Sequence, residues 1–314
     1  MVKVSAPGKL ILFGEHAVVY GEAAIATAVN KRAFVTAEKF GEPRIIVESS
    51  KFDEPIHSDL KEETDNPVVK SAQETLKFLN KNSGVKLNIS SRIPISVGMG
   101  SSASTVTAAS SSILSLFDSS KNERGAVAKI AYEAEKATHG KYSGINTAVT
   151  TLGGTILFQK GKVEQVRTEP LNVIVGNSGI KKDTKKIVDE IRSKVEDPRV
   201  AYNIFTIGSI VRKAKKAIHE NNLPELGRLM DKNHYYLREL GVSSRRLENL
   251  VEAAREAGAY GAKITGSGGG GCIIALAEDP DPVIDALKEK GAEAFMVKTH
   301  QGGVRDEKTP ESFQ

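Results

Sequence analysis

The sequence predicts a mixed fold of helices and strands that is divided into two domains. Its 314 residues are enough for two domains of ordinary size. Strand-like and helical patterns alternate in the first half, whereas the second half is mostly helical. The composition changes near residue 170, so we expect one domain over 1–170 and another over 171–314.

In the first half, short runs with apolar alternation and β-branched residues predict strands. Apolar residues spaced three and four apart predict helices. The predicted strands are Lys9–Phe13, Arg32–Lys39, Ile45–Glu48, Val85–Ser90 and Thr155–Gln159, and the predicted helices are Pro67–Lys81, Ser101–Phe117, Asn122–His139 and Asn146–Thr151.

In the second half, the same two patterns predict more helices than strands. A polar tail after Gln301 is expected to be loose. The predicted strands are Leu171–Val175, Ala262–Thr265, Cys272–Ala277 and Ala294–Lys298, and the predicted helices are Thr184–Val195, Val200–Asn221, Pro224–Leu240, Ser244–Ala257 and Pro282–Lys290.

The composition argues against nucleic acid and membrane as partners. The net charge of +5 would suit a polyanion, but the 44 basic residues are mixed with 39 acidic ones. Tryptophan is absent and aromatic residues make up only 5%, so side chains on which bases could stack are scarce. No apolar stretch reaches the roughly 18 residues that a membrane-spanning helix needs.

The N-terminus and the cysteine content favour the cytoplasm. The first ten residues, MVKVSAPGKL, lack the apolar core and the cleavage site of a secretory signal. The single cysteine, Cys272, rules out a disulfide framework and fits a reducing compartment.

The segment SVGMGSSAS, residues 96–104, lies between a predicted strand and a predicted helix. Glycines let backbone N–H groups approach a ligand closely, and a helix start directs unpaired N–H groups at a phosphate. Alternatively, the serines simply cap the helix with their side-chain oxygens. The segment alone leaves both interpretations open.

Other motifs for phosphate binding or catalysis are missing or misplaced. No Walker pattern occurs, nor do the G-x-S-x-G and H-E-x-x-H patterns. The run GSGGGG at 266–271 matches G-x-G-x-x-G, but a strand-like segment follows it, whereas a dinucleotide site needs a helix there. These observations exclude a Rossmann interpretation of the run.

Three stretches, PGKLILFGEHAVVYG at 7–21, PISVGMGSSAS at 94–104 and KITGSGGGGC at 263–272, resemble the three motifs of the GHMP kinases. The segment GEHAVVYG is most similar to the mevalonate kinase branch of that family. The resemblance implies an α+β fold of two domains, an N-terminal ribosomal S5-like domain and a helix-rich C-terminal domain, with an ATP cleft between them.

The resemblance also implies how ATP and Mg²⁺ bind. In the mevalonate kinase branch a loop serine and a helix glutamate hold Mg²⁺, and they match Ser102 and Glu135. Mg²⁺ prefers one or two protein oxygens plus water and phosphates. Alternatively, Glu135 is a solvated helix charge. The residues implied in ATP binding are Pro94, Ile95, Ser96, Val97, Gly98, Met99, Gly100, Ser101, Ser102, Ala103, Ser104 and Gly268.

The remaining motif residues are implied to surround the substrate. By resemblance, Lys9 neutralises charge on the transferring phosphoryl group, and Glu15 and His16 hydrogen-bond the substrate. Ser143 and Thr265 are further implied substrate contacts. The alternative for Glu15 and His16 is a surface pair at the end of a strand.

One position departs from the family pattern. Where the family has an aspartate that receives the proton of the substrate hydroxyl, this chain has Asn146, in HGKYSGINTAV. An amide has no basic lone pair, and general-base catalysis contributes about 10²–10⁴-fold. A substitution made to study the protein, a natural divergence with another base, and a non-catalytic relative all remain open.

The resemblance therefore predicts an ATP-dependent kinase that converts mevalonate to 5-phosphomevalonate in isoprenoid synthesis, with turnover impaired by Asn146. Two alternatives are a GHMP kinase for another small alcohol and a non-catalytic protein that binds a nucleotide or a prenyl diphosphate. A homodimer is also an open expectation, because dimers are common in the family.

Overall fold

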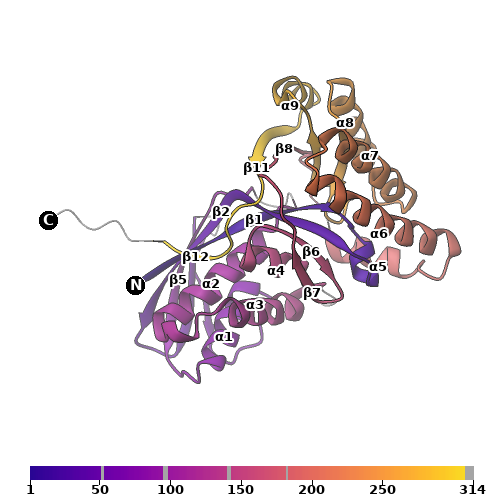
Figure 1. Cartoon of the computed structure of the whole chain (residues 1–314). Helices are drawn as coiled ribbons and strands as arrows, with labels where there is room; N and C mark the ends of the chain where they lie inside the picture. The colour runs from indigo at the N-terminus through magenta and orange to yellow at the C-terminus, as the bar shows by residue number, and fades with distance from the viewer. Residues whose placement is uncertain (51–52, 95–97, 140–142, 182, 308–314) are drawn as a thin grey trace.

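The computed structural model describes residues 1–50, 53–94, 98–139, 143–181 and 183–307. The chain forms two α+β halves, each built on its own sheet (Figure 1). Within the described residues, no helix is both long and apolar enough to cross a bilayer. The predicted combination of helices and strands in an α+β fold is confirmed.

The first sheet has the order β12-β1-β2-β5-β3-β4, and β6 and β7 extend it from β2. The long strand β2 is central because it pairs with β1, β5 and β6. The strands are β1 (Val2–Phe13), β2 (Ala24–Phe40), β3 (Arg44–Ser49), β4 (Ile56–Asp59), β5 (Gly84–Ser91), β6 (Thr155–Gln159), β7 (Lys162–Gln165) and β12 (Arg305–Asp306).

Helices α1 (Pro67–Phe78), α2 (Ser101–Phe117), α3 (Arg124–His139) and α4 (Ile145–Leu152) pack together beside this sheet (Figure 1). Helix α2 is almost entirely buried, and it contacts β1, β2 and the three other helices. Its small side chains allow this close packing on all sides. The start of α2 is thereby fixed against β1.

The second sheet has the order β11-β8-β10-β9 and carries the helices of the second half. Its strands are β8 (Asn172–Asn177), β9 (Gly261–Thr265), β10 (Cys272–Leu276) and β11 (Glu293–Lys298). Its helices are α5 (Thr184–Arg192), α6 (Pro198–His219), α7 (Leu223–Glu239), α8 (Arg245–Glu256) and α9 (Pro280–Glu289).

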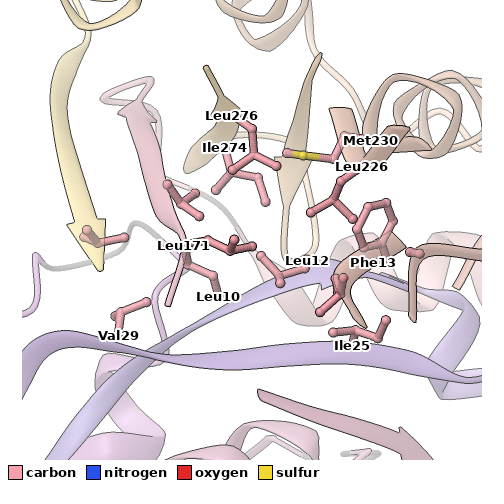
Figure 2. Close-up of a cluster of buried hydrophobic side chains, with 14 of the residues drawn as sticks. Leu10, Leu12, Phe13, Ile25, Val29, Leu171, Leu226, Met230, Ile274 and Leu276 are labelled. Carbon is pink, nitrogen blue, oxygen red and sulfur yellow. The ribbon is translucent and has the colours of Figure 1, made fainter. Parts of the chain in front are cut away.

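A shared apolar core joins the two halves. Leu10, Leu12 and Phe13 of β1 lie in the same buried cluster as Met230 of α7 and Ile274 of β10 (Figure 2). Because burial of apolar surface is the main stabilising term in folding, this shared core holds β1 against the second half. The boundary predicted at residue 170 falls between β7 and β8, which belong to different sheets.

The end of the chain departs from the prediction. The tail after Gln301 was expected to be loose, but β12 pairs with β1, and Glu307 N–H donates to Lys3 O at 2.8 Å. We call residues 299–307 the C-terminal strap. The strap returns the chain to the first sheet, so the expectation of a loose tail is wrong for its described part. The short strands β4 and β7 were also not predicted.

Arg32 holds the C-terminal strap in place. Its guanidinium donates to Gly302 O at 2.9 Å, to Gly303 O at 2.7 Å and to Ser5 Oγ at 2.7 Å. Ser5 Oγ in turn donates to Glu307 Oε1 at 2.5 Å. Burial lowers the pKa of Arg32 to about 10, which leaves the side chain charged at neutral pH.

We predict that Arg32→Met lowers the free energy of unfolding by about 3 kcal/mol or more, because buried carbonyl groups lose a charged donor. Urea denaturation measures this change. The control is Arg44→Met, which removes only exposed ion pairs and should change stability by about 1 kcal/mol or less. Equal effects of the two substitutions would contradict the role given to Arg32.

Candidate active site

Lys9 joins β1 to the glycine loop, residues 94–100, of which the structure describes Pro94 and Gly98 to Gly100. Its backbone N–H donates to Met99 O at 2.9 Å, and its Nζ donates to Gly98 O at 2.8 Å. Gly100 makes room for the lysine, since a Cβ there would lie 2.8 Å from Lys9 Cγ. The lysine is only 3% exposed, so the loop and its cation form one packed unit.

Helix α2 begins at this loop without a side-chain cap among the described residues. Its N-cap is Gly100, with φ 74°. The serines bond elsewhere: Ser104 Oγ lies within hydrogen-bond distance of both Pro7 O and Gly100 O. In contrast, α1 and α5 to α9 each start with an Asp, Asn or Ser that accepts an N–H of the first turn. The simple capping interpretation is therefore wrong, and the helix start suits an anion.

Other loop residues were also predicted to bind ATP. Ser101 and Ala103 lie in the first turn of α2, and Pro94 precedes the loop. The predicted ATP contacts Ile95, Ser96 and Val97 lie outside the described residues.

Ser102 and Glu135 come together beside the loop. Ser102 Oγ, on α2, donates a short hydrogen bond to Glu135 Oε1, on α3. Glu135 is 3% exposed, so the alternative of a solvated helix charge is wrong. A hydroxyl and a carboxylate oxygen side by side fit Mg²⁺, which takes few protein ligands when it also binds phosphates. Among the described residues, no cluster of three or more His, Cys, Asp or Glu offers a denser metal site.

Asn146 lies in the first turn of α4, which begins at Gly144 with φ 89° and packs against α2 and β1. Its Oδ1 is buried and accepts no hydrogen bond within the described part of the chain. Ser143 Oγ accepts the N–H of Ile145 at 3.4 Å. The predicted catalytic position is therefore carried by a helix that touches the strand bearing Lys9.

The first and third motifs meet in the interior. Glu15 Oε1 forms an ion pair with Lys263 Nζ of β9, and both side chains are completely buried. His16 Nε2 lies 2.9 Å from Ser267 O. Both motif residues are at most 5% exposed, so the alternative of a surface pair at a strand end is wrong.

Thr265 and Gly268 of the third motif, which were predicted to bind ligands, are both packed against other parts of the protein. Thr265 Oγ1 donates to Ile11 O at 2.9 Å and is fully buried. Gly268 has φ 74°, and a Cβ there would lie 2.1 Å from Val242 O. Close packing therefore accounts for both residues, and their roles toward substrate and ATP stay predictions.

The structure adds residues that the sequence did not reveal. Lys263 is the one charged residue of the buried strand GAKIT, and this contrast is the only local signal of its contact with Glu15. Asn233 Oδ1 accepts the Gly14 N–H at 3.4 Å, and His234 Nδ1 accepts the Ile264 N–H at 3.4 Å. These two residues are buried polar side chains of the amphipathic helix α7. The helical pattern does not indicate which residues they contact, so the sequence could not predict these hydrogen bonds.

Comparisons with known proteins agree with this geometry. The family described as GHMP kinases N terminal domain matches residues 66–154, and GHMP kinases C terminal matches 214–293. The mevalonate kinase of Pyrococcus furiosus is 37% identical, with 98% of each chain covered. The chain belongs to the GHMP kinase family. The predicted resemblance is thus confirmed.

Solved structures of mevalonate kinases resemble this GHMP kinase closely. The Methanococcus jannaschii enzyme superposes with a TM-score of 0.84 at 28% identity, covering 95% of this chain and 98% of that one. The L. major mevalonate kinase in complex with R-mevalonate has a TM-score of 0.82 at 28% identity, covering 96% and 97%. The GHMP kinase fold in two parts is therefore confirmed.

Burial shifts the pKa values of the groups where the two halves of this GHMP kinase meet. Desolvation raises the pKa of Glu15 and lowers that of Lys263, and each shift is opposed by the attraction between the two groups. Desolvation also lowers the pKa of His234 to about 4. Since His234 Nδ1 accepts a hydrogen bond, the single proton of the neutral ring is on Nε2, which lies 3.0 Å from Glu248 Oε1.

We predict that His234 makes this kinase sensitive to acid. The unfolded chain binds a proton at His234 below its ordinary pKa of 6.5, whereas the folded chain does so only near 4. Stability is therefore lost as the pH falls from about 6.5 to about 4, by about 2 to 3 kcal/mol from this group. Urea denaturation at pH 7 and pH 4.5 measures the loss.

The control separates His234 from the carboxylates that also titrate in this range. His234→Gln should reduce the difference in stability between pH 7 and pH 4.5, whereas His219→Gln, at the exposed end of α6, should leave it unchanged. If His234→Gln loses as much stability between pH 7 and pH 4.5 as the unaltered chain does, the buried imidazole does not cause the sensitivity to acid.

Proposed function

We propose that this GHMP kinase transfers the γ-phosphoryl group of ATP to the primary 5-hydroxyl of mevalonate. The observation that carries the proposal is the convergence of Lys9, the uncapped start of α2 and the Ser102–Glu135 pair at one loop. Relatives that are named mevalonate kinase match nearly the whole chain, which supports mevalonate as the acceptor.

The protein groups at the loop would bind the triphosphate mainly by electrostatics. Phosphoryl transfer has a loose transition state with charge on the transferring oxygens, so catalysis depends on positioning and on fixed positive charge. The Lys9 ammonium provides a full charge, and the N–H groups at the start of α2 provide partial charges. Both are held in place before ligand arrives, because the lysine is packed under Gly98 and Gly100.

Ser102 and Glu135 would hold Mg²⁺. When bound, the ion supplies charge neutralisation to the phosphate oxygens. The Ser102 hydroxyl donates to the buried Glu135 carboxylate. Binding a cation would turn the hydroxyl so that its oxygen lone pair, not its proton, faces the site.

Asn146 affects the chemical step more than binding. The substrate hydroxyl must release its proton as the new P–O bond forms, and an amide oxygen cannot accept a proton at neutral pH. Asn146 can still donate or accept a hydrogen bond, so it can orient the hydroxyl. The arrangement therefore supports ligand binding together with slow transfer.

Asn146 also favours a second candidate function, a nucleotide-binding protein without kinase activity. The phosphate-binding groups described above do not require a proton acceptor, so ATP would bind in either case. A coupled assay for ADP release distinguishes the two, since only the kinase releases ADP in a mevalonate-dependent manner.

We predict that Asn146→Asp raises mevalonate phosphorylation at least about tenfold, because it restores a group that can accept the proton. The coupled ADP-release assay measures the rate. Asn146→Ala is the matched control and should not raise it. Unchanged or lower turnover in the aspartate variant would mean that position 146 is not an impaired base.

We further predict that Ser102→Ala and Glu135→Gln each weaken Mg²⁺-dependent ATP binding. A contact to a charged group contributes about 1.5–3 kcal/mol, which corresponds to about tenfold or more in affinity. Calorimetry with and without Mg²⁺ tests this, with Glu133→Gln, exposed on the same helix, as the control. If both variants bind ATP with Mg²⁺ as tightly as the unaltered chain, the assignment of Ser102 and Glu135 as Mg²⁺ ligands is wrong.

A further inference from the structure

The face of β9 that points toward β1 is polar although it is buried. Side chains alternate along a strand, so Lys263 and Thr265 share one face while Ala262 and Ile264 share the other. The apolar face joins the core under α8 and α9. The polar face contacts the first motif, through Glu15 and the backbone of β1.

Helix α7 covers the free edge of β9. Ala262 N–H donates to Asp231 Oδ1 at 2.9 Å, and Ile264 N–H donates to His234 Nδ1 at 3.4 Å. These side chains satisfy backbone donors that a partner strand would otherwise take. The strand that carries Lys263 is therefore fixed on both edges, by β10 and by α7.

The turn that carries Glu15 has little conformational freedom. Gly14 has φ 94°, and a Cβ there would lie 2.5 Å from Ala23 O, so only glycine fits. His16 has φ 61°, an uncommon value for a side chain of its size. Two residues of the second half contact this turn: Asn233 accepts the Gly14 N–H, and Lys263 donates to Glu15.

Stability alone does not explain a buried pair of charges. Replacing such a pair with well-packed apolar side chains is often neutral or stabilising, whereas removal of one partner is strongly destabilising. Lys263 Nζ has a second acceptor in Ile264 O at 2.6 Å, so its direction is fixed. Glu15 Oε2 is buried and has no hydrogen-bond partner among the described residues. The pair thus fixes geometry at an energetic cost.

We propose that Lys263 is a positioning residue that holds the Gly14–His16 turn through the Glu15 carboxylate and so sets the substrate side of the site. The turn directly follows the strand that bears Lys9, and its next residues form a 3₁₀-helix, Ala17–Tyr20. This inference rests on the proposed function, because that function assigns the turn to the substrate.

The test compares Lys263→Met, Lys263→Arg and the double variant Lys263→Met/Glu15→Gln with the unaltered chain. Lys86→Met, which removes an ion pair to Glu48 on the first sheet, is the control. We measure hydrogen exchange over residues 14–20, and mevalonate and ATP-analogue affinities by calorimetry. The double variant supplies a folded sample if Lys263→Met unfolds, because it leaves no unpaired buried charge.

We expect at least tenfold faster exchange over 14–20 in both methionine variants, with at least tenfold weaker mevalonate binding in Lys263→Met. The affinity for the ATP analogue should change less than threefold, and Lys263→Arg should recover most of the mevalonate affinity. A purely structural role would weaken the binding of both ligands together in Lys263→Met, or leave exchange over 14–20 in the double variant as in the unaltered chain, and either result would overturn the proposal.

Failure of the proposed function gives a different result. In that case the unaltered chain binds the ATP analogue but not mevalonate, and the exchange data alone decide the role of Lys263. Exchange over 14–20 that is unchanged in the methionine variants would then overturn the positioning role.

Discussion

The contact between β1 and the glycine loop determines where the rest of the site lies. Two hydrogen bonds from Lys9 reach consecutive carbonyls, one from its backbone and one from its side chain. A β-bulge between Pro7 and Gly8 changes the register of β1 just before the lysine, as bulges often do beside functional sites. Gly98, Met99 and the start of α2 are therefore held directly against Lys9.

The same strand connects this site to the second half. Beyond Lys9, β1 contributes Leu10, Leu12 and Phe13 to a core shared with α7 and β10 (Figure 2). In addition, Ile11 O accepts a hydrogen bond from Thr265 Oγ1. The border between the halves is consequently a packed interior crossed by buried polar contacts. Such a border fixes the first and third motifs relative to each other.

Elements defined by local pattern could be predicted from the sequence, whereas those defined by distant partners could not. Helix α2 was predicted with its observed bounds, Ser101–Phe117, as a helix of small residues that ends in an apolar edge. The two-residue strand β12 pairs with β1 across almost the whole chain length, so no local pattern marks it. Motif resemblance similarly named Ser102 and Glu135, which do meet. It did not single out Lys263, the first residue of the third motif, because its partner Glu15 lies 248 positions away in the turn after β1.

Asn146 separates two requirements that an aspartate at this position would combine. A carboxylate accepts a proton, but it also places a negative charge near the helix starts and the lysine that would attract phosphates. An amide removes both effects together. Because the N-cap residues of α2 and α4 are both glycines, no N-cap side chain offsets their partial positive charges, although Ser143 Oγ accepts the Ile145 N–H at the start of α4. An amide at position 146 adds neither a negative charge nor a proton acceptor, so under the proposed function the affinity for an anionic ligand and the turnover need not change in the same direction.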